Sequence, residues 1–169
     1  DLYKFTDVSD KKATIKVNGQ AVDYAIENGY AVLNRTWKKG DMVEVNLPME
    51  VRKVAANEKV KDDIGKIALQ RGPLMYCAEW VDNNGKASNI IVPENTAFTI
   101  ENRPDLLNGL TVIKSQVPEV IIGDKGQSIN TVTKSFVAIP YYAWANRGKG
   151  EMEVWFPTKV KNVDLITVE

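Results

Sequence analysis

The chain has 169 residues, 44% of them hydrophobic and 26% charged, so it can form one ordinary globular domain or two small ones and is too apolar for a disordered tail. Its 22 basic and 22 acidic residues balance to a formal net charge of zero. Phosphate binding needs a basic surface, so this balance argues against nucleic acid as the main ligand. No apolar run is long enough to cross a membrane, and no signal peptide opens the chain.

The residue types for metal or acid–base chemistry are scarce. The sequence has no histidine, which removes the commonest metal ligand and the usual general base near neutral pH. Its single cysteine, Cys77, lies in the apolar run "LMYCA" and is expected to be a small buried hydrophobic residue. We therefore expect no catalytic residue, no metal site and no cofactor in this chain.

The first third of the chain has the alternation of β-strands. Residues 13–19, "ATIKVNG", alternate and end in Asn18-Gly19, a pair that favours a tight hairpin turn. Residues 29–37 and 42–48 are predicted strands on either side of a turn at 38–41. Their apolar residues share a parity and are predicted to form one buried face: Ala31, Leu33, Trp37, Val43, Val45 and Leu47. We expect Arg35 to lie against the Trp37 ring.

The rest of the chain also indicates strands. The polar residues 51–65 are the best candidate for a junction between domains. Residues 66–82 are predicted strands interrupted by a bulge or break at Gly72-Pro73, because proline cannot donate to a central ladder. Glu79, at the end of this segment, is expected to pair with Arg71 or Arg52 and so hold two strands together. Further short strands are predicted at residues 89–93, 97–101, 109–122 and 128–140.

Many short strands with little helix predict an all-β chain of the β-sandwich or jelly-roll class. We divide it into residues 1–65, the remainder of one sandwich, and residues 66–169, a complete sandwich. Five strands are few for the first sandwich, and an incomplete one leaves strand edges unpaired. The chain is therefore predicted to self-associate through those edges.

Four stretches taken together resemble a known family: "VNGQ", "GYAVLNRTWKKGDMVEVNLPMEVRKV", "IALQRGPLMYCAEWVDN" and "AIPYYAWANRGKGEMEVWFP". In this order they are similar to the non-catalytic region of glycoside hydrolase family 127, bacterial enzymes of the β-L-arabinofuranosidase type. The resemblance implies the end of a middle β-sandwich followed by a C-terminal β-sandwich. It places the chemistry, a Glu acid/base and a zinc-bound Cys nucleophile, in an (α/α)6 catalytic barrel that this chain lacks. Cys77 lies outside that nucleophile motif.

Residues 136–157, "FVAIPYYAWANRGKGEMEVWFP", gather most of the candidate site residues. We interpret them as a hairpin with a five-residue loop at 146–150. This pairing places Trp144 opposite Met152 and Tyr142 opposite Val154 on a core-facing side. The outer side then holds Tyr141, Trp155 and Glu153.

The outer side is a candidate surface for docking another domain or for binding carbohydrate. Within the loop, Asn146 is expected either to adopt left-handed backbone geometry or to belong to the site. Arg147 is expected to bind a carboxylate across a domain interface or a sugar hydroxyl.

Three functions remain open from sequence. The first is an accessory, non-catalytic part of a glycoside hydrolase for plant-derived, arabinose-containing glycans, bracing its own catalytic barrel. The second is a carbohydrate-binding module in its own right, and the third is a general interaction or adhesin-like sandwich. The family resemblance implies a bacterial protein of the periplasm or the extracellular space.

Overall fold

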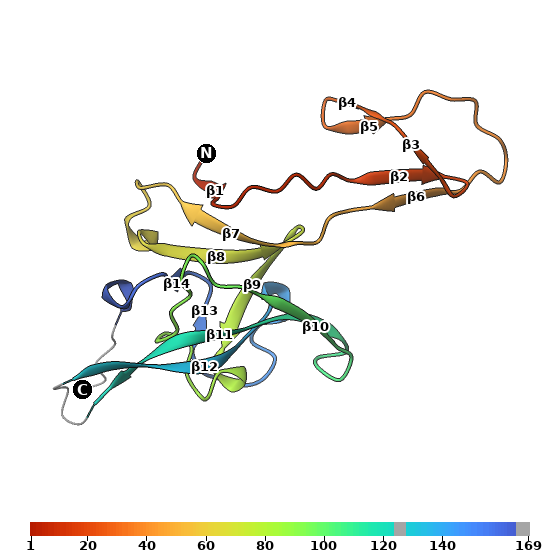
Figure 1. Ribbon diagram of the computed structural model, residues 1–169. Coiled ribbons are helices and arrows are strands. Elements are labelled where there is room, and N and C mark those ends of the chain that lie inside the picture. The colour runs from red at the N-terminus through yellow and green to blue at the C-terminus, as the bar shows by residue number, and fades with distance from the viewer. Residues whose placement is uncertain (124–127, 165–169) are drawn as a thin grey trace. The chain divides into compact units, whose positions relative to one another are not determined.

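The computed structural model describes residues 1–123 and 128–164 (Figure 1). It is built from antiparallel strands and short 3-10 turns, so the prediction of an all-β chain is confirmed. The chain divides into two compact units: Ser9–Met49, the small unit, and Asp1–Val8 with Glu50–Glu169, the large unit. The described residues include no helix long and apolar enough to span a membrane.

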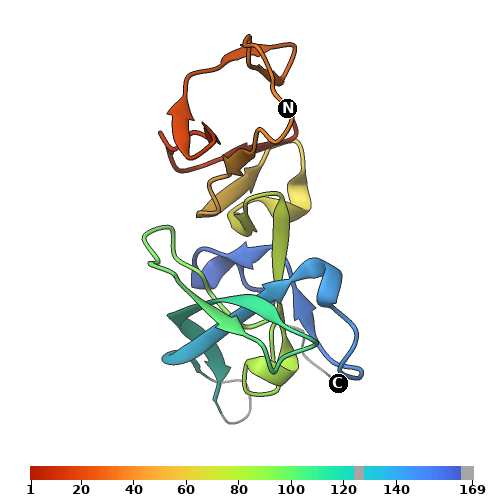
Figure 2. The same cartoon turned by 90° about the vertical axis from the view of Figure 1, so that its right-hand side faces the viewer.

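The large unit contains one extended antiparallel sheet in the order β1-β7-β8-β9-β12-β11-β10, with β13 paired to β9 and β14 to β8. The long strands β11 and β12 run side by side in both views (Figures 1 and 2). The strands are β1 Tyr3–Phe5, β7 Val51–Ala56, β8 Lys66–Arg71, β9 Leu74–Glu79, β10 Thr99–Arg103, β11 Leu110–Ile122, β12 Ile129–Pro140, β13 Met152–Glu153 and β14 Phe156–Pro157. The 3-10 turns are η1 Lys61–Asp63, η2 Trp80–Asp82, η4 Tyr141–Ala143 and η5 Val160–Asn162.

The connection at residues 57–65 lies inside the large unit. Strands β7 and β8 pair directly, with Val51 opposite Arg71 and Val54 opposite Ala68, so this polar segment links two neighbouring strands of one sheet. Strand β1 pairs with β7, which brings residues 1–8 into the same unit. The units therefore divide at residues 8/9 and 49/50, whereas the polar run suggested residue 65. Composition cannot distinguish a solvated hairpin connection from a linker.

Gly72 and Pro73 form the two-residue turn of a hairpin. Arg71 pairs with Leu74, and Gly72 has a φ of 56°, a left-handed backbone that glycine adopts at little cost. Proline here needs no ladder partner, because the turn lies outside the ladder. The expected strands on both sides of this dipeptide are confirmed.

The core of the large unit lies on both faces of its sheet. One cluster contains Leu69, Tyr76 and Phe136, together with Phe156, whose ring meets Phe136 edge-on at 5.3 Å. The other cluster contains Cys77, Val112 and Ile139 among its buried members. Cys77 is fully buried and free, so its prediction as a small core residue is confirmed.

The small unit contains a three-stranded sheet of order β3-β2-β6 and a separate hairpin, β4-β5. Its strands are β2 Thr14–Val17, β3 Gln20–Val22, β4 Ala25–Glu27, β5 Tyr30–Val32 and β6 Val43–Asn46. Asn18 and Gly19 have φ values of 52° and 78° and join β2 to β3, which confirms the predicted turn.

The predicted pairing of residues 29–37 with 42–48 is wrong. Strand β5 pairs with β4, and β6 pairs with β2. The predicted buried face is wrong as well, because the large apolar side chains Trp37, Val43, Val45 and Leu47 are exposed. Only Ile15 and Val17 are buried in this unit. The predicted cation–π contact is confirmed, with the Arg35 guanidinium 5.0 Å from the centre of the Trp37 ring.

Candidate functional site

The segment 140–157 does not form the predicted hairpin. Strand β12 ends at Pro140 and the chain turns into η4. The following residues then pair with earlier strands: Met152 lies opposite Glu79 on β9, and Phe156 lies opposite Ile67 on β8. The predicted contacts of Trp144 with Met152 and of Tyr142 with Val154 are therefore wrong as strand pairs.

The aromatic side chains after β12 lie at the surface. Tyr142 is 67% exposed and Trp144 is 40% exposed, so their prediction as core residues is wrong. Tyr141 is also exposed, and its ring stacks on Trp144 at 5.9 Å with an interplanar angle of 20°. In a 3-10 turn, residues three apart lie on the same side, which brings these two rings together.

Arg147 is the centre of an ion-pair cluster within the large unit. Its Nε donates to Glu79 Oε2 at 3.1 Å and its Nη1 donates to Asp82 Oδ1 at 2.8 Å, while Nη2 contacts both carboxylates. The Glu79 side chain is only 3% exposed. The hydrogen bonds to Asp82 have the largest effect and, with those to Glu79, raise the pKa of Arg147, although its partial burial acts to lower it. Glu79 therefore pairs with Arg147, and the predicted pairing with Arg71 or Arg52 is wrong.

The same carboxylate also holds the backbone before Arg147. The Ala145 N–H donates to Glu79 Oε1 at 3.2 Å, and Ala145 has the left-handed φ of 68° that was expected of its neighbour. Asn146 instead uses its side chain, whose amide donates to the carbonyls of Ala143 and Trp144 at 3.0 and 3.2 Å. The loop that carries Tyr141 and Trp144 is thus fixed by the buried Glu79 carboxylate and by hydrogen bonds from the Asn146 side-chain amide.

Trp155 and Glu153 have different contacts from Tyr141. The Trp155 ring stacks on Tyr3 of β1 at 5.6 Å, so the two candidate rings Tyr141 and Trp155 each have a different stacking partner. The Trp155 N–H donates to Glu153 Oε1 at 3.2 Å. Burial raises the pKa of Glu153, against the opposing effect of the backbone bond from Trp155. No contact is recorded among the described residues between Tyr141 and either Trp155 or Glu153, which were predicted to share one outer face.

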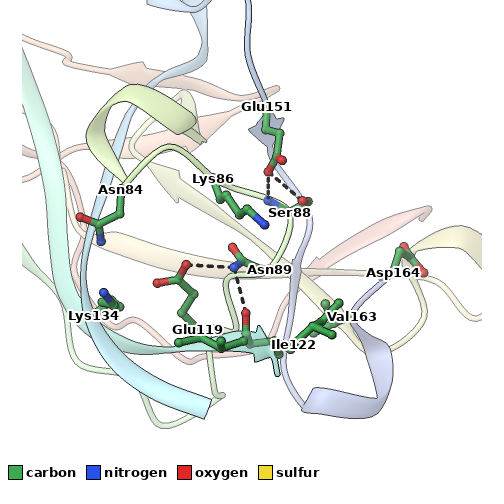
Figure 3. A pocket seen from close by; sticks show the side chains of 12 residues that line it. Asn84, Lys86, Ser88, Asn89, Glu119, Ile122, Lys134, Glu151, Val163 and Asp164 are labelled. Atoms are coloured by element: carbon green, nitrogen blue, oxygen red, sulfur yellow. Dashed lines mark hydrogen bonds between the residues drawn. The ribbon is translucent and has the colours of Figure 1, made fainter. Parts of the chain in front are cut away.

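A pocket of about 560 Å³ lies beside the end of β11 (Figure 3). Its polar residues include Lys86, Asn89, Glu119, Lys134 and Glu151, and Ile122 supplies part of its apolar wall. Glu119 is nearly buried and accepts a bond from Asn89 Nδ2 at 2.9 Å. Sequence reasoning missed this pocket, because Glu119 and Asn89 are 30 positions apart and no local pattern links them.

Glu151 anchors one side of this pocket. Its Oε2 accepts bonds from the Ala87 N–H, the Ser88 N–H and the Ser88 hydroxyl at 2.9, 3.1 and 2.8 Å. Burial acts to raise the pKa of Glu151, and these three bonds outweigh it and lower the pKa. The Ser88 hydroxyl donates its hydrogen bond to the Glu151 carboxylate, whose lowered pKa makes it a poor base for activating that hydroxyl, and the pocket lining contains neither Cys nor His. The arrangement suits binding of a small polar molecule better than bond cleavage.

The residues that the structure describes do not fit a zinc centre. The sequence has no histidine, and the described residues contain no group of three or more Cys, Asp or Glu side chains placed to hold a metal ion. Burial raises the pKa of the Cys77 thiol to about 12, and the nearby Glu79 carboxylate acts in the same direction. A zinc ligand must be a thiolate, so Cys77 is unsuited to the role.

Two family models match adjacent parts of the chain. Residues 51–157 match the glycoside hydrolase family 127 C-terminal domain, and residues 9–49 match the β-L-arabinofuranosidase, GH127 middle domain. The two matched ranges coincide closely with the large and small units.

Relatives with known functions or structures agree. A non-reducing end β-L-arabinofuranosidase of Bifidobacterium longum is 33% identical over 157 residues, covering 84% of this chain and 23% of the relative. A solved GH127 β-arabinofuranosidase is 40% identical with a TM-score of 0.90, covering 96% of this chain and 26% of that one. A GH127 β-L-arabinofuranosidase from Geobacillus stearothermophilus T6 is 38% identical with a TM-score of 0.79, covering 87% and 24%.

The all-β fold and the two matched domains show that this chain is a β-domain region of the kind found in glycoside hydrolases. The chain belongs to glycoside hydrolase family 127. It spans about a quarter of the length of the relatives that it matches.

Proposed function

We propose that this chain is the accessory, non-catalytic part of a longer β-L-arabinofuranosidase-like protein and braces its catalytic part. The observation that carries this proposal is the coverage: a middle domain and a C-terminal domain account for residues 9–49 and 51–157, and the arabinofuranosidase relatives are about four times longer. The resemblance of the sequence to the family would assign bond cleavage to an (α/α)6 barrel with bound zinc, located in the part of the longer protein outside this chain.

The small unit supports a bracing role, because its apolar side chains are uncovered. Val43 and Val45 of β6 lie opposite Val17 and Ile15, so all four face the same side of the sheet. Val17 and Ile15 are buried, but Val43 and Val45 are exposed. A three-stranded sheet with exposed apolar side chains on one face gains stability when a further layer covers that face. Further strands of the longer protein would supply that layer.

The chemistry of the acidic residues also supports a non-catalytic part. Glu79 is bound by the Arg147 guanidinium and the Ala145 N–H, so its carboxylate has a structural task. Glu151 is similarly occupied by the Ala87 and Ser88 backbone and the Ser88 hydroxyl. An acid/base carboxyl group of a glycosidase must be free to give a proton to the leaving group at an open sugar site. The carboxylates of Glu79 and Glu151 are both held by other bonds.

The proposal is tested by measuring hydrolysis of an aryl β-L-arabinofuranoside. We expect no turnover by this chain alone and turnover by a longer polypeptide that contains it. In that polypeptide, deletion of the 51–157 region should lower the melting temperature of the catalytic part. Turnover by this chain alone that is lost in Glu119→Gln would overturn the proposal and would place an active site in the pocket of Figure 3.

A further inference from the structure

We propose that the stacked rings of Tyr141 and Trp144 form a binding platform for a sugar ring of β-L-arabinofuranose-containing oligosaccharides. This inference rests on the proposed function for the choice of sugar. The evidence for a platform is the exposure of the two rings, the hydrogen bonds that fix their loop, and the polar groups at their rims, the Tyr141 hydroxyl and the Trp144 indole N–H.

Both rings are open to solvent although they are among the largest apolar groups of the chain. Tyr141 is 45% exposed and Trp144 is 40% exposed, and they stack on each other with an interplanar angle of 20°. Within the described residues neither the Tyr141 hydroxyl nor the Trp144 indole N–H has a hydrogen-bond partner. An exposed ring pair with polar tips at its rim offers a ligand both an apolar face and hydrogen-bonding groups.

The platform is held by groups that do not touch the ligand face. The Trp144 N–H donates to the Tyr141 carbonyl at 3.1 Å, which closes the turn that stacks the rings. The next residue, Ala145, is fixed by the Glu79 carboxylate, and Asn146 bonds back to the Trp144 carbonyl. Arg147 then binds Glu79 and Asp82. Such pre-organisation lowers the entropy lost on binding, which matters most for a weakly held ligand.

The size of the platform favours a sugar over a protein partner. Aromatic side chains offer roughly 150–250 Å² each, so the exposed parts of these two rings present on the order of 200 Å². A stable protein interface buries about 800 Å² on each partner. On their own the two rings supply only part of such an area, and they match the face of one or two sugar rings.

The chemistry of the platform selects a neutral sugar. The C–H groups of a sugar ring are weakly positive and lie favourably on the negative face of an aromatic ring. The hydroxyls of the sugar can bond the Tyr141 hydroxyl and the Trp144 indole N–H at the rim. Arg147 has its guanidinium occupied by two carboxylates, so it does not recruit an acidic sugar. Arabinofuranose, which is neutral, meets these requirements.

The experiment is saturation-transfer NMR on β-L-arabinofuranosyl disaccharide in the presence of this chain, because the signal is read on the sugar and needs no tryptophan reporter. We expect transfer to the sugar ring protons, loss of that transfer in Trp144→Ala, and an affinity about tenfold weaker in Tyr141→Ala. The matched control is Trp37→Ala in the small unit, whose ring is comparably exposed and should leave binding unchanged. Circular dichroism of each variant checks that it is folded.

Three results would overturn the platform. They are absence of transfer to the wild-type chain, equal loss in Trp37→Ala, and unchanged binding in a folded Trp144→Ala variant. Equal iodide quenching of the longer protein and its Trp144→Phe variant without sugar would show that Trp144 is buried there, and would instead assign these rings to contact with the catalytic part. Failure of the platform is separate from failure of the proposed function, because the latter is read from hydrolysis by the longer protein.

Discussion

Arg147 and Glu79 stand 68 positions apart and form the ion pair that fixes the loop after β12 to the end of β9. The Glu79 side chain is 3% exposed and the Arg147 side chain is 14% exposed, so both charges are largely removed from water. A buried charge is tolerated when it is paired and its remaining bonding capacity is used. Here the second oxygen of Glu79 accepts the Ala145 N–H, which completes its bonding.

Replacing Arg147→Ala should destabilise the large unit strongly, because it leaves the buried Glu79 carboxylate without its cation. Removal of one partner from a buried pair costs about 3–5 kcal/mol. Arg147→Lys should be intermediate, since one ammonium cannot reproduce the forked bonds to Glu79 and Asp82. The free energy of unfolding in urea measures both effects.

The control for this prediction is Arg103→Ala. Arg103 also binds a carboxylate, with its Nη2 2.8 Å from Asp105, but the pair lies at the surface. Solvent screens such pairs, so we expect little change in stability. Equal stability of the Arg147→Ala and wild-type chains would show that the cluster contributes nothing to folding.

Glu153→Gln should stabilise the chain at neutral pH. Burial raises the pKa of Glu153 in the folded state above its ordinary value of 4.5, so the folded state holds its proton more tightly than the unfolded state does. The stability that the folded state gains from this tighter proton binding is complete below pH 4.5 and is lost as the pH rises through the folded-state pKa. Glutamine is neutral at every pH and keeps an oxygen to accept the Trp155 N–H.

The gain from Glu153→Gln should therefore appear above pH 4.5 and vanish in acid, as measured by urea unfolding across pH 3–8. Glu151→Gln is the control, because the pKa of Glu151 is lowered by its three bonds. The stabilisation from Glu151 is present above pH 4.5 and is lost as the pH falls through its folded-state pKa, so its removal should destabilise at neutral pH. A stability change of the same sign for Glu153→Gln and Glu151→Gln at neutral pH would contradict the opposite pKa shifts of the two carboxyl groups.

Cys77 should be inert in the native chain. Its side chain is fully buried, and burial raises the thiol pKa to about 12, so almost no thiolate exists at pH 8. We expect slow reaction with a chromogenic disulfide reagent in buffer and reaction of one thiol per chain in denaturant. Fast labelling of the native chain would show that β9 opens locally or that the thiol is accessible.

Local signals in the sequence were sufficient to locate the hairpin turns. Asn18-Gly19 was predicted as a tight turn and is one, with a left-handed backbone between β2 and β3. At Gly72-Pro73 the predicted bulge or break is a two-residue turn, so the interruption was located correctly but its type was not. The burial of Cys77 likewise follows from the apolar run around it. These features depend on residues within a few positions of each other.

The candidate site depends on contacts that sequence spacing cannot supply. Parity in residues 136–157 assumed that neighbouring segments pair with each other, whereas β13 and β14 pair with β9 and β8, more than 70 positions earlier. Arg147 was expected to bind a carboxylate across a domain interface or a sugar hydroxyl, and Glu79 was expected to pair with Arg71 or Arg52. The fold instead pairs Arg147 with Glu79 inside the large unit. The exposed apolar face of β6 was mistaken for core because its alternation is the same whether or not a second layer covers it.

That exposed face leads to a prediction of self-association. Strand β6 is the edge of its sheet, and Val45 is 57% exposed on the face that also carries the buried Ile15. An unpaired apolar edge recruits strands from other chains. Light scattering should therefore give a mass above the 18.9 kDa of one chain, increasing with concentration.

Val45→Lys should return the mass toward that of a single chain, because a charge on this face opposes both strand addition and apolar packing. Glu44→Lys is the matched control: Glu44 lies on the same strand opposite Lys16, on the other face, and its replacement leaves the apolar surface intact. We expect Glu44→Lys to associate like the wild-type chain. A wild-type mass of 18.9 kDa at every concentration would show that the small unit protects its own edge.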